Sequence, residues 1–178
     1  MWKKVQVELY VQDRGDAVCQ TEAVNGCDGN AQIPAEIWKD WFERWLEILR
    51  FHPSSPICEI GLRLTDDTEI QSLNAQYRHQ NKPTDVLSFA ALEGDYPLSE
   101  EILASESLYL GDIVISLDTA QRQAQQQDHP LPTELAWLAS HGLLHLLGWD
   151  HPDEESLSQM LKQQVLLLES VGIAFGIE

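Results

Sequence analysis

Three histidines near the C-terminal end of the chain have the spacing of a metal site. They lie in residues 141–151, HGLLHLLGWDH. His141 and His145 are four residues apart, so on a helix their rings project from one face about a turn apart. Gly148 is the residue type that ends a helix in the left-handed conformation, and the turn would bring His151 round to face them. Three imidazoles leave one position of a tetrahedral zinc site open, which is the arrangement of a catalytic site.

The other interpretation is three core histidines that are each satisfied by a hydrogen bond. One histidine on an apolar helix is usually of that kind. Two on one helix face with no other polar residue nearby, and a third after a glycine, favour a metal. Several buried and unpaired imidazoles would otherwise cost on the order of a few kcal/mol. Zn²⁺ suits this site, and Ni²⁺ or another divalent ion stays open because affinity alone does not select zinc.

The same spacing occurs in the zincin signature HExxHxxGxxH, so a metalloprotease-like hydrolase is one alternative. In that chemistry a glutamate next to the first histidine is the general base for the zinc-bound water. This chain has Gly142 at that position. A glycine offers no carboxylate, which disfavours peptide hydrolysis by this mechanism.

Four further residues are candidates for the surroundings of the site. Asp112 follows Gly111 on an expected strand and could accept a hydrogen bond from a ligand imidazole. Asp150 precedes His151 and could do the same or act as a base. We favour the simpler interpretation, in which both carboxylates are solvated or cap a helix. Asp85 and Ser88 are expected to line the cleft.

The elements that position these residues can be predicted from the pattern of apolar residues. Period-two and short apolar segments predict strands at Val5–Val11, Ile57–Leu64, Val86–Ala90 and Leu110–Ile115. Helices are expected from Pro34 to His52, from Asp66 to before Asn81, after Ser116, from Pro132 to Leu147 and after Pro152. The helix that ends at Leu147 is apolar nearly all round, so we expect it to be buried with the metal site at its end.

These elements indicate an α+β fold with about four strands in a mixed sheet and about five helices. At 178 residues, the chain 1–178 suits a single domain. Residues 12–32 have no periodicity and are predicted to be a flexible insertion. The three cysteines have no CxxC spacing, so we expect them to be reduced.

Composition and charge restrict the partners. No stretch of about 20 apolar residues is present, so we expect no membrane partner. The N-terminus has no signal-peptide pattern, and we expect a cytoplasmic protein. The net charge of −18 leaves no room for a large basic face, so DNA is not an expected partner. RNA chemistry would have to use a local group of cations.

Three segments together resemble the YbeY family of metal-dependent endoribonucleases, which mature ribosomal RNA. They are residues 83–89 (PTDVLSF), residues 110–115 (LGDIVI) and the histidine segment 141–151. The resemblance extends from about Ile57 to Gly172, and residues 12–32 depart from it. It implies a single-strand-specific endoribonuclease that acts in 16S rRNA 3′-end maturation and ribosome quality control. It also implies a zinc ion held by His141, His145 and His151.

The resemblance also singles out Arg78, which matches the arginine of the family's Tyr-Arg pair. A guanidinium can bind a phosphate through two hydrogen bonds and stabilise charge in a transition state. The simpler interpretation is a solvated helix end. The expected partners are single-stranded RNA and the ribosome or its proteins. A ribosome-assembly factor with a structural metal is the alternative from another class of protein.

Overall fold

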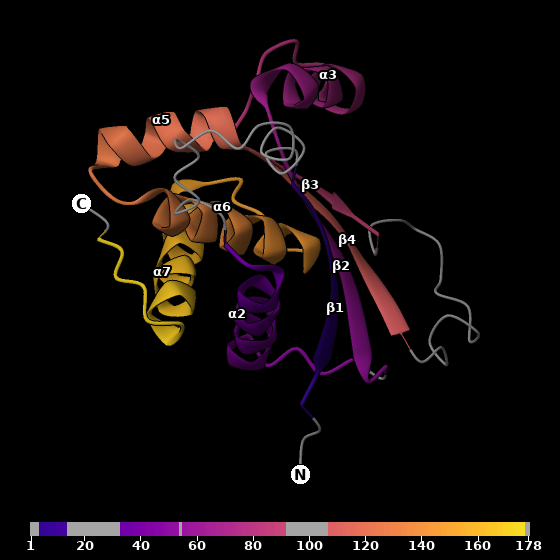
Figure 1. Ribbon diagram of the computed structural model, residues 1–178. Coiled ribbons are helices and arrows are strands. Elements are labelled where there is room, and N and C mark those ends of the chain that lie inside the picture. Colours follow the sequence, from indigo (N-terminus) through magenta and orange to yellow (C-terminus); the bar gives the residue numbers. More distant parts are fainter. Residues whose placement is uncertain (1–3, 14–32, 54, 92–106, 177–178) are drawn as a thin grey trace, which may run out of the picture.

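The structure is a computed structural model that describes residues 4–13, 33–53, 55–91 and 107–176. These residues form four strands and five helices, shown in Figure 1. In chain order they are β1 (Gln6–Asp13), α2 (Ala35–Ile48), β2 (Ile57–Thr65), α3 (Asp67–Arg78), β3 (Val86–Ala90), β4 (Ser107–Ser116), α5 (Leu117–Gln127), α6 (Leu131–Leu146) and α7 (Glu154–Ser170). The α+β fold predicted from the sequence is therefore confirmed. Of the predicted insertion, Gln12 and Asp13 end β1, and residues 14–32 lie outside the described residues.

The sheet is mixed and has the strand order β1-β2-β4-β3. β1, β2 and β4 are parallel, whereas the edge strand β3 pairs antiparallel to β4. Side chains alternate between the two faces of the sheet along β2. One set, Cys58, Ile60, Leu62 and Leu64, is apolar and packs in the hydrophobic core. The residues between them lie on the opposite face.

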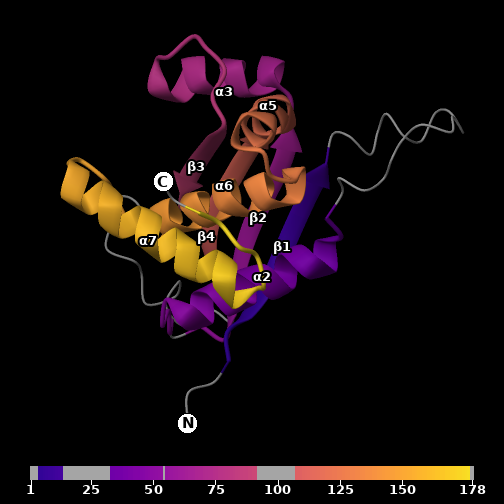
Figure 2. The ribbon, with the colours of Figure 1, turned by 90° about the vertical axis from the view of Figure 1, so that its left-hand side faces the viewer.

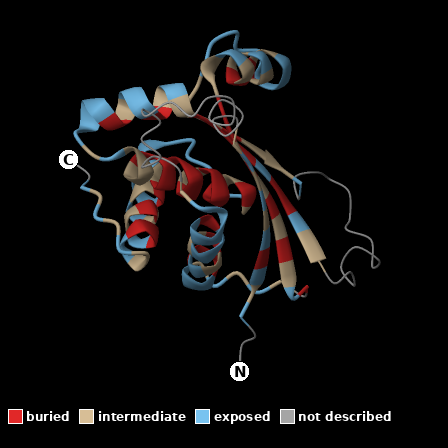
Figure 3. Cartoon of the chain, viewed as in Figure 1, coloured by how far each residue is buried: buried red, intermediate tan, exposed pale blue. Residues whose placement is uncertain are grey.

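Helices α2 and α6 cover one face of the sheet, and α7 packs against these two helices (Figures 1 and 2). Trp38, Phe42 and Trp45 form the buried stripe of α2 and pack against one another through their rings. Helix α6 is buried along most of its length, as its sequence predicted (Figure 3). A long apolar helix therefore carries the candidate histidines from the core to the edge of the molecule.

On the opposite face, α3 covers only the β3–β4 side of the sheet. Ile70, Leu87 and Val114 form a small second core beneath it. Beside them lies a cavity of about 720 Å³, whose lining includes Tyr10 and Asp112. This cavity and α6 are on different sides of the sheet.

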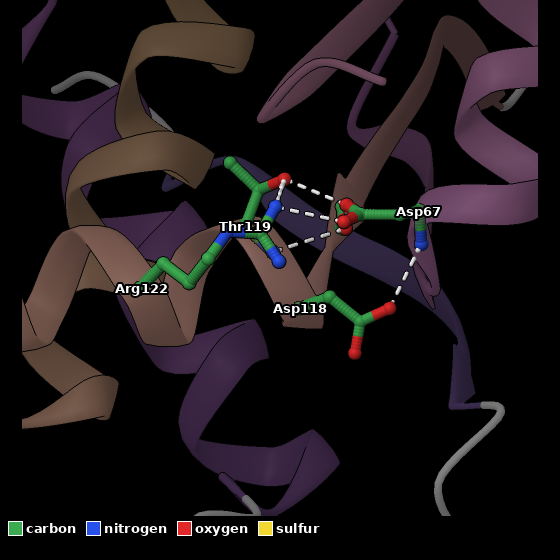
Figure 4. A network of polar contacts seen from close by, with 5 residues as sticks. Asp67, Asp118, Thr119 and Arg122 are labelled. Atoms are coloured by element: carbon green, nitrogen blue, oxygen red, sulfur yellow. Dashed lines mark hydrogen bonds and ion pairs between the residues drawn. The ribbon is translucent and has the colours of Figure 1, made fainter. Parts of the chain in front are cut away.

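The start of α3 is tied to α5 by a network of polar contacts around Asp67 (Figure 4). Its carboxylate accepts hydrogen bonds from Ser116 Oγ at 2.6 Å, Thr119 Oγ1 at 2.7 Å and an Arg122 nitrogen at 2.7 Å. Burial raises the pKa of Asp67, but these hydrogen bonds outweigh burial and the pKa lies below its usual value. Asp118 accepts from the Asp67 backbone N–H at 3.0 Å. The network holds α3 in place and so helps to position its C-terminal residue, Arg78.

Candidate metal centre

The three histidines predicted from the sequence come together at the C-terminal end of α6. One ring nitrogen from each of His141, His145 and His151 lies within 4.8 Å of the others. The Nε2 atoms of His141 and His145 are 3.0 Å apart. Two nitrogens bound to one tetrahedral zinc ion at about 2.0–2.1 Å would be about 3.3 Å apart, so this spacing suits a shared metal.

The local backbone conformation brings the three rings together. Helical spacing places His145 one turn after His141, and the ring centroids are 4.6 Å apart. The helix then ends, and Gly148 adopts φ +93°, a value that L side chains rarely tolerate. The chain turns back, and the exposed His151 reaches the other two rings, with centroid separations of 5.6 and 5.3 Å.

The environment keeps the two helical histidines uncharged. Burial lowers the pKa of His141, and the charges of His151 and Arg78 lower it further. Burial also lowers the pKa of His145 to about 4, with smaller contributions in the same direction from His141 and His151. A metal binds the unprotonated imidazole, so both side chains are in their ligand form at neutral pH.

Each of these two rings also has a partner on its outer side. His141 Nδ1 lies 3.1 Å from Oε1 of Gln164, a fully buried residue of α7. His145 has a hydrogen bond with the backbone of Trp149. Because the outer side of each ring is occupied, the facing Nε2 atoms remain to hold a cation, and the residues present therefore fit a divalent metal.

Gln164 was missed in the sequence analysis, although a signal for it exists. It lies four residues after Met160 and four before Leu168, both of which are buried. A polar residue in the middle of an apolar helix stripe needs a hydrogen-bonding partner. The sequence could not show that this partner is a histidine of another helix.

Gly142 lies where α6 approaches the sheet most closely. A Cβ atom there would be 2.7 Å from Ile113 Cγ2 and 3.1 Å from Ser88 Oγ. Ser88 donates a hydrogen bond to the Gly142 carbonyl at 3.0 Å, which ties β3 to α6 between the two helical histidines. Position 142 thus faces the sheet rather than the metal centre. The zincin glutamate would have neither room nor the correct direction here, and the protease alternative loses its base for a steric reason as well.

Arg78 is the exposed last residue of α3, and its charge acts on the metal centre. It lowers the pKa of both His141 and His145. Asp85 acts in the opposite direction and raises the pKa of His141. Its carboxylate accepts from the Val86 backbone N–H at 2.8 Å and from Gln123 Nε2 at 3.3 Å. The structure thus brings Arg78 and Asp85 to the neighbourhood of the histidines.

The orienting role considered for Asp112 does not fit its place in the structure. Its neighbour Ile113 packs against α6, and strand alternation therefore directs Asp112 to the other face of the sheet. There its carboxylate lies over Gly61 and accepts a hydrogen bond from Tyr109. It does not orient a ligand imidazole.

Asp150 makes a local contact. Its Oδ1 atom accepts a hydrogen bond from the backbone N–H of His151 at 2.8 Å. This contact shapes the turn that carries His151 to the metal centre. The carboxylate is exposed, in agreement with a capping or solvated role.

Comparison with known proteins identifies the family. The family described as Endoribonuclease YbeY matches residues 24–172 of this chain. The chain belongs to the YbeY family. The match begins well before Ile57, so the likeness to YbeY reaches further toward the N-terminus than the three motifs indicated. It also begins within the segment 12–32.

Relatives that are each named Endoribonuclease YbeY align over nearly the whole chain. The protein of Trichormus variabilis is 63% identical over 174 residues, which are 97% of this chain and 98% of the relative. That of Nostoc sp. is also 63% identical and covers 97% of this chain and 94% of its own. That of Trichodesmium erythraeum is 51% identical, over 99% of this chain and 97% of the relative.

A solved structure has a similar fold over most of the chain. The solution structure of TM1509 from Thermotoga maritima matches with a TM-score of 0.51 and 24% identity, over 92% of this chain and 89% of that one.

Within the described residues, no helix is long and apolar enough to cross a membrane.

Proposed function

We propose that this member of the YbeY family is a zinc-dependent endoribonuclease that cuts single-stranded RNA. His141, His145 and His151 hold the zinc ion, and Arg78 binds the phosphate at the cleavage site. The substrate is ribosomal RNA, the role is maturation of the 16S rRNA 3′ end and ribosome quality control, and the ribosome or its proteins are the partners.

The observation that carries the proposal is the convergence of three ring nitrogens at the exposed end of a buried helix. Helix α6 holds two ligands rigidly, whereas His151 lies at the surface and leaves the centre accessible. A bound zinc ion supplies a Lewis acid for a phosphoryl oxygen and lowers the pKa of a coordinated water. A purely structural site would be closed by a fourth protein ligand, and the described residues offer three.

Charge supports a single-stranded substrate. Arg78 at the end of α3 and Lys82 in the segment between α3 and β3 are both exposed, and no ion pair is seen for either among the described side chains. Two cations can hold one or two phosphates, whereas a duplex needs a wider basic surface, which a net charge of −18 does not provide. Ser88 fixes β3 against α6 through its hydrogen bond to the Gly142 carbonyl. The Asp85 carboxylate fixes the start of β3 by accepting from the Val86 backbone N–H.

The assembly-factor alternative draws support from the same negative charge, because a free acidic protein binds RNA weakly. It predicts association with ribosomes that is insensitive to salt. Phosphate contacts predict instead that cleavage falls steeply as salt rises. The two hypotheses therefore differ in a measurable property.

Removal of the metal tests the proposed activity directly. A labelled 16S rRNA fragment with a single-stranded 3′ tail is incubated with the protein as purified, after chelation, and after chelation followed by Zn²⁺ or Ni²⁺. We expect chelation to abolish cleavage of the tail and one of the two metals to restore it. A duplex of the same tail should resist cleavage. Absence of cleavage by protein with one zinc per chain would instead support the assembly factor.

Arg78→Ala tests the phosphate contact. Loss of a charged donor at a transition state typically costs about a hundredfold in rate, so we expect about that decrease in cleavage. Zinc content should stay at the wild-type level because Arg78 is not a ligand. Arg78→Lys keeps the charge without the paired donors and should be intermediate.

Arg44→Ala serves as the matched control, since Arg44 is also exposed on a helix but lies on α2 and pairs with Glu47. It should cleave like the wild type. A loss of zinc in Arg78→Ala would contradict the assignment of Arg78 to phosphate binding.

A further inference from the structure

Gln164 lies at the meeting point of two helices behind the metal centre. Its side chain is fully buried and belongs to α7. The Oε1 atom faces His141 Nδ1 at 3.1 Å, while Nε2 faces the Trp137 carbonyl oxygen at 3.1 Å and Ser140 Oγ at 3.4 Å. A buried amide therefore connects the backbone of α6 to one of the candidate ligands.

The partners of this amide determine its orientation. The Trp137 carbonyl can only accept hydrogen bonds, so the amide must present its NH₂ group there. The Ser140 hydroxyl donates its own proton to the same carbonyl at 2.8 Å, which leaves Oγ as an acceptor for the second N–H. A reversed amide would place two acceptor oxygens in contact in a buried site, at a cost of about 1–3 kcal/mol. The Oε1 atom is thereby left facing His141.

The orientation of the amide in turn determines the tautomer of His141. Because Oε1 can only accept, the proton of the neutral ring is on Nδ1. The Nε2 atom then carries a lone pair, and it is this atom that lies 3.0 Å from His145 Nε2. The hydrogen bonds of the Gln164 amide thus leave Nε2 of His141, on the other side of the ring, free to bind a metal ion.

We propose that Gln164 is a positioning residue of the metal centre, whose amide holds His141 in the Nδ1–H tautomer with Nε2 directed at the metal. The inference rests on the proposed metal site but not on RNA cleavage. Partners of this kind typically change metal affinity by about 10–100-fold. Gln164 acts through His141 and is not itself a ligand.

Gln164→Met tests the inference, because methionine has a similar length and neither accepts nor donates as an amide does. We expect zinc affinity, measured by competition with a chromophoric chelator, to fall about 10–100-fold. Gln164→Glu keeps an acceptor for Nδ1–H but has no N–H for the Trp137 carbonyl, so we expect a zinc affinity between those of Gln164→Met and the wild type. Gln159→Met, at an exposed position of α7, is the control and should bind zinc like the wild type.

The ¹⁵N signals of the histidine rings, recorded without metal at pH 8, report the tautomer itself. Wild-type His141 should show a protonated Nδ1, and Gln164→Met should shift the population toward a protonated Nε2. A protonated Nε2 in the wild type would overturn the inference even if the methionine variant failed to fold. So would a folded methionine variant with unchanged tautomer or unchanged zinc affinity. A wild type with the expected tautomer that binds zinc but cuts no RNA would refute only the proposed activity.

Discussion

His141→Ala is expected to lose the bound metal and, with it, cleavage of single-stranded RNA. The substitution removes the Nε2 atom that faces His145 at 3.0 Å and leaves two of the three ligand atoms. A Lewis acid contributes several kcal/mol to a phosphoryl-transfer step, and each 1.4 kcal/mol is tenfold in rate. The loss should therefore be about a hundredfold or more. Zinc per chain, measured by elemental analysis, and cleavage rate should fall together.

The fold should survive this change, because α6 is held by its apolar contacts rather than by the metal. Leu143, Leu144 and Leu146 stay buried whether or not position 141 bears a ring. His52→Ala provides a control histidine outside the cluster and should keep both metal and activity. Equal cleavage by His141→Ala and the wild type, purified identically, would place the chemistry elsewhere or reveal a contaminating nuclease.

Gly142→Glu, which would complete the zincin signature, is expected to destabilise the protein strongly and to create no protease. The first side-chain atom would already be 2.7 Å from Ile113 Cγ2, and the carboxylate would enter the buried interface between α6 and the sheet. Overpacking costs about 1–3 kcal/mol, and a buried unpaired polar group costs about 1–3 kcal/mol more. The free energy of unfolding, from urea titration, should fall by roughly 2–6 kcal/mol or the protein should not fold.

Gly142→Ala allows the same stability measurement if the glutamate variant is insoluble. Alanine gains about 1 kcal/mol of helix propensity over glycine, which offsets part of the clash, so we expect a net loss of up to about 2 kcal/mol. Ile113→Ala removes both of the isoleucine atoms nearest the added Cβ. In the double variant the penalty of alanine at 142 should therefore decrease, with the contact to Ser88 Oγ remaining. Additive effects of the two substitutions would show that Ile113 is not what excludes a side chain.

The cluster of three candidate metal ligands could be predicted from the sequence because its geometry is local. The separation of His141 and His145 is set by the helical repeat, and the return of His151 is set by one glycine with positive φ. No contact from a distant part of the chain is needed to bring these three rings together. The same holds for α6 itself, whose apolar residues on all sides required a buried position.

Asp112 and Gln164 show what local pattern could not decide. Strand alternation along β4 indicates that Asp112 and Ile113 lie on opposite faces of the sheet. Only the packing of α6 decides which of these faces is next to the metal centre. The pairing of β2 with β4 also changes register between Glu59 and Ile60, so that Leu110 has no partner in β2. The apolar pattern of either strand does not predict this irregularity. Gln164 meets His141 because α7 packs across α6, a contact between residues 23 positions apart.

The sequence by itself determined the three ligand candidates, the helix that carries them and the mixed α+β architecture. Only the tertiary structure decided which polar side chains surround that centre. The reason is physical: helical spacing and turn conformation depend on neighbours along the chain, whereas hydrogen-bond partners depend on which surfaces pack together. Gly142 illustrates the difference. The sequence shows that position 142 is a glycine, but only the distance from Ile113 explains why a larger side chain does not fit there.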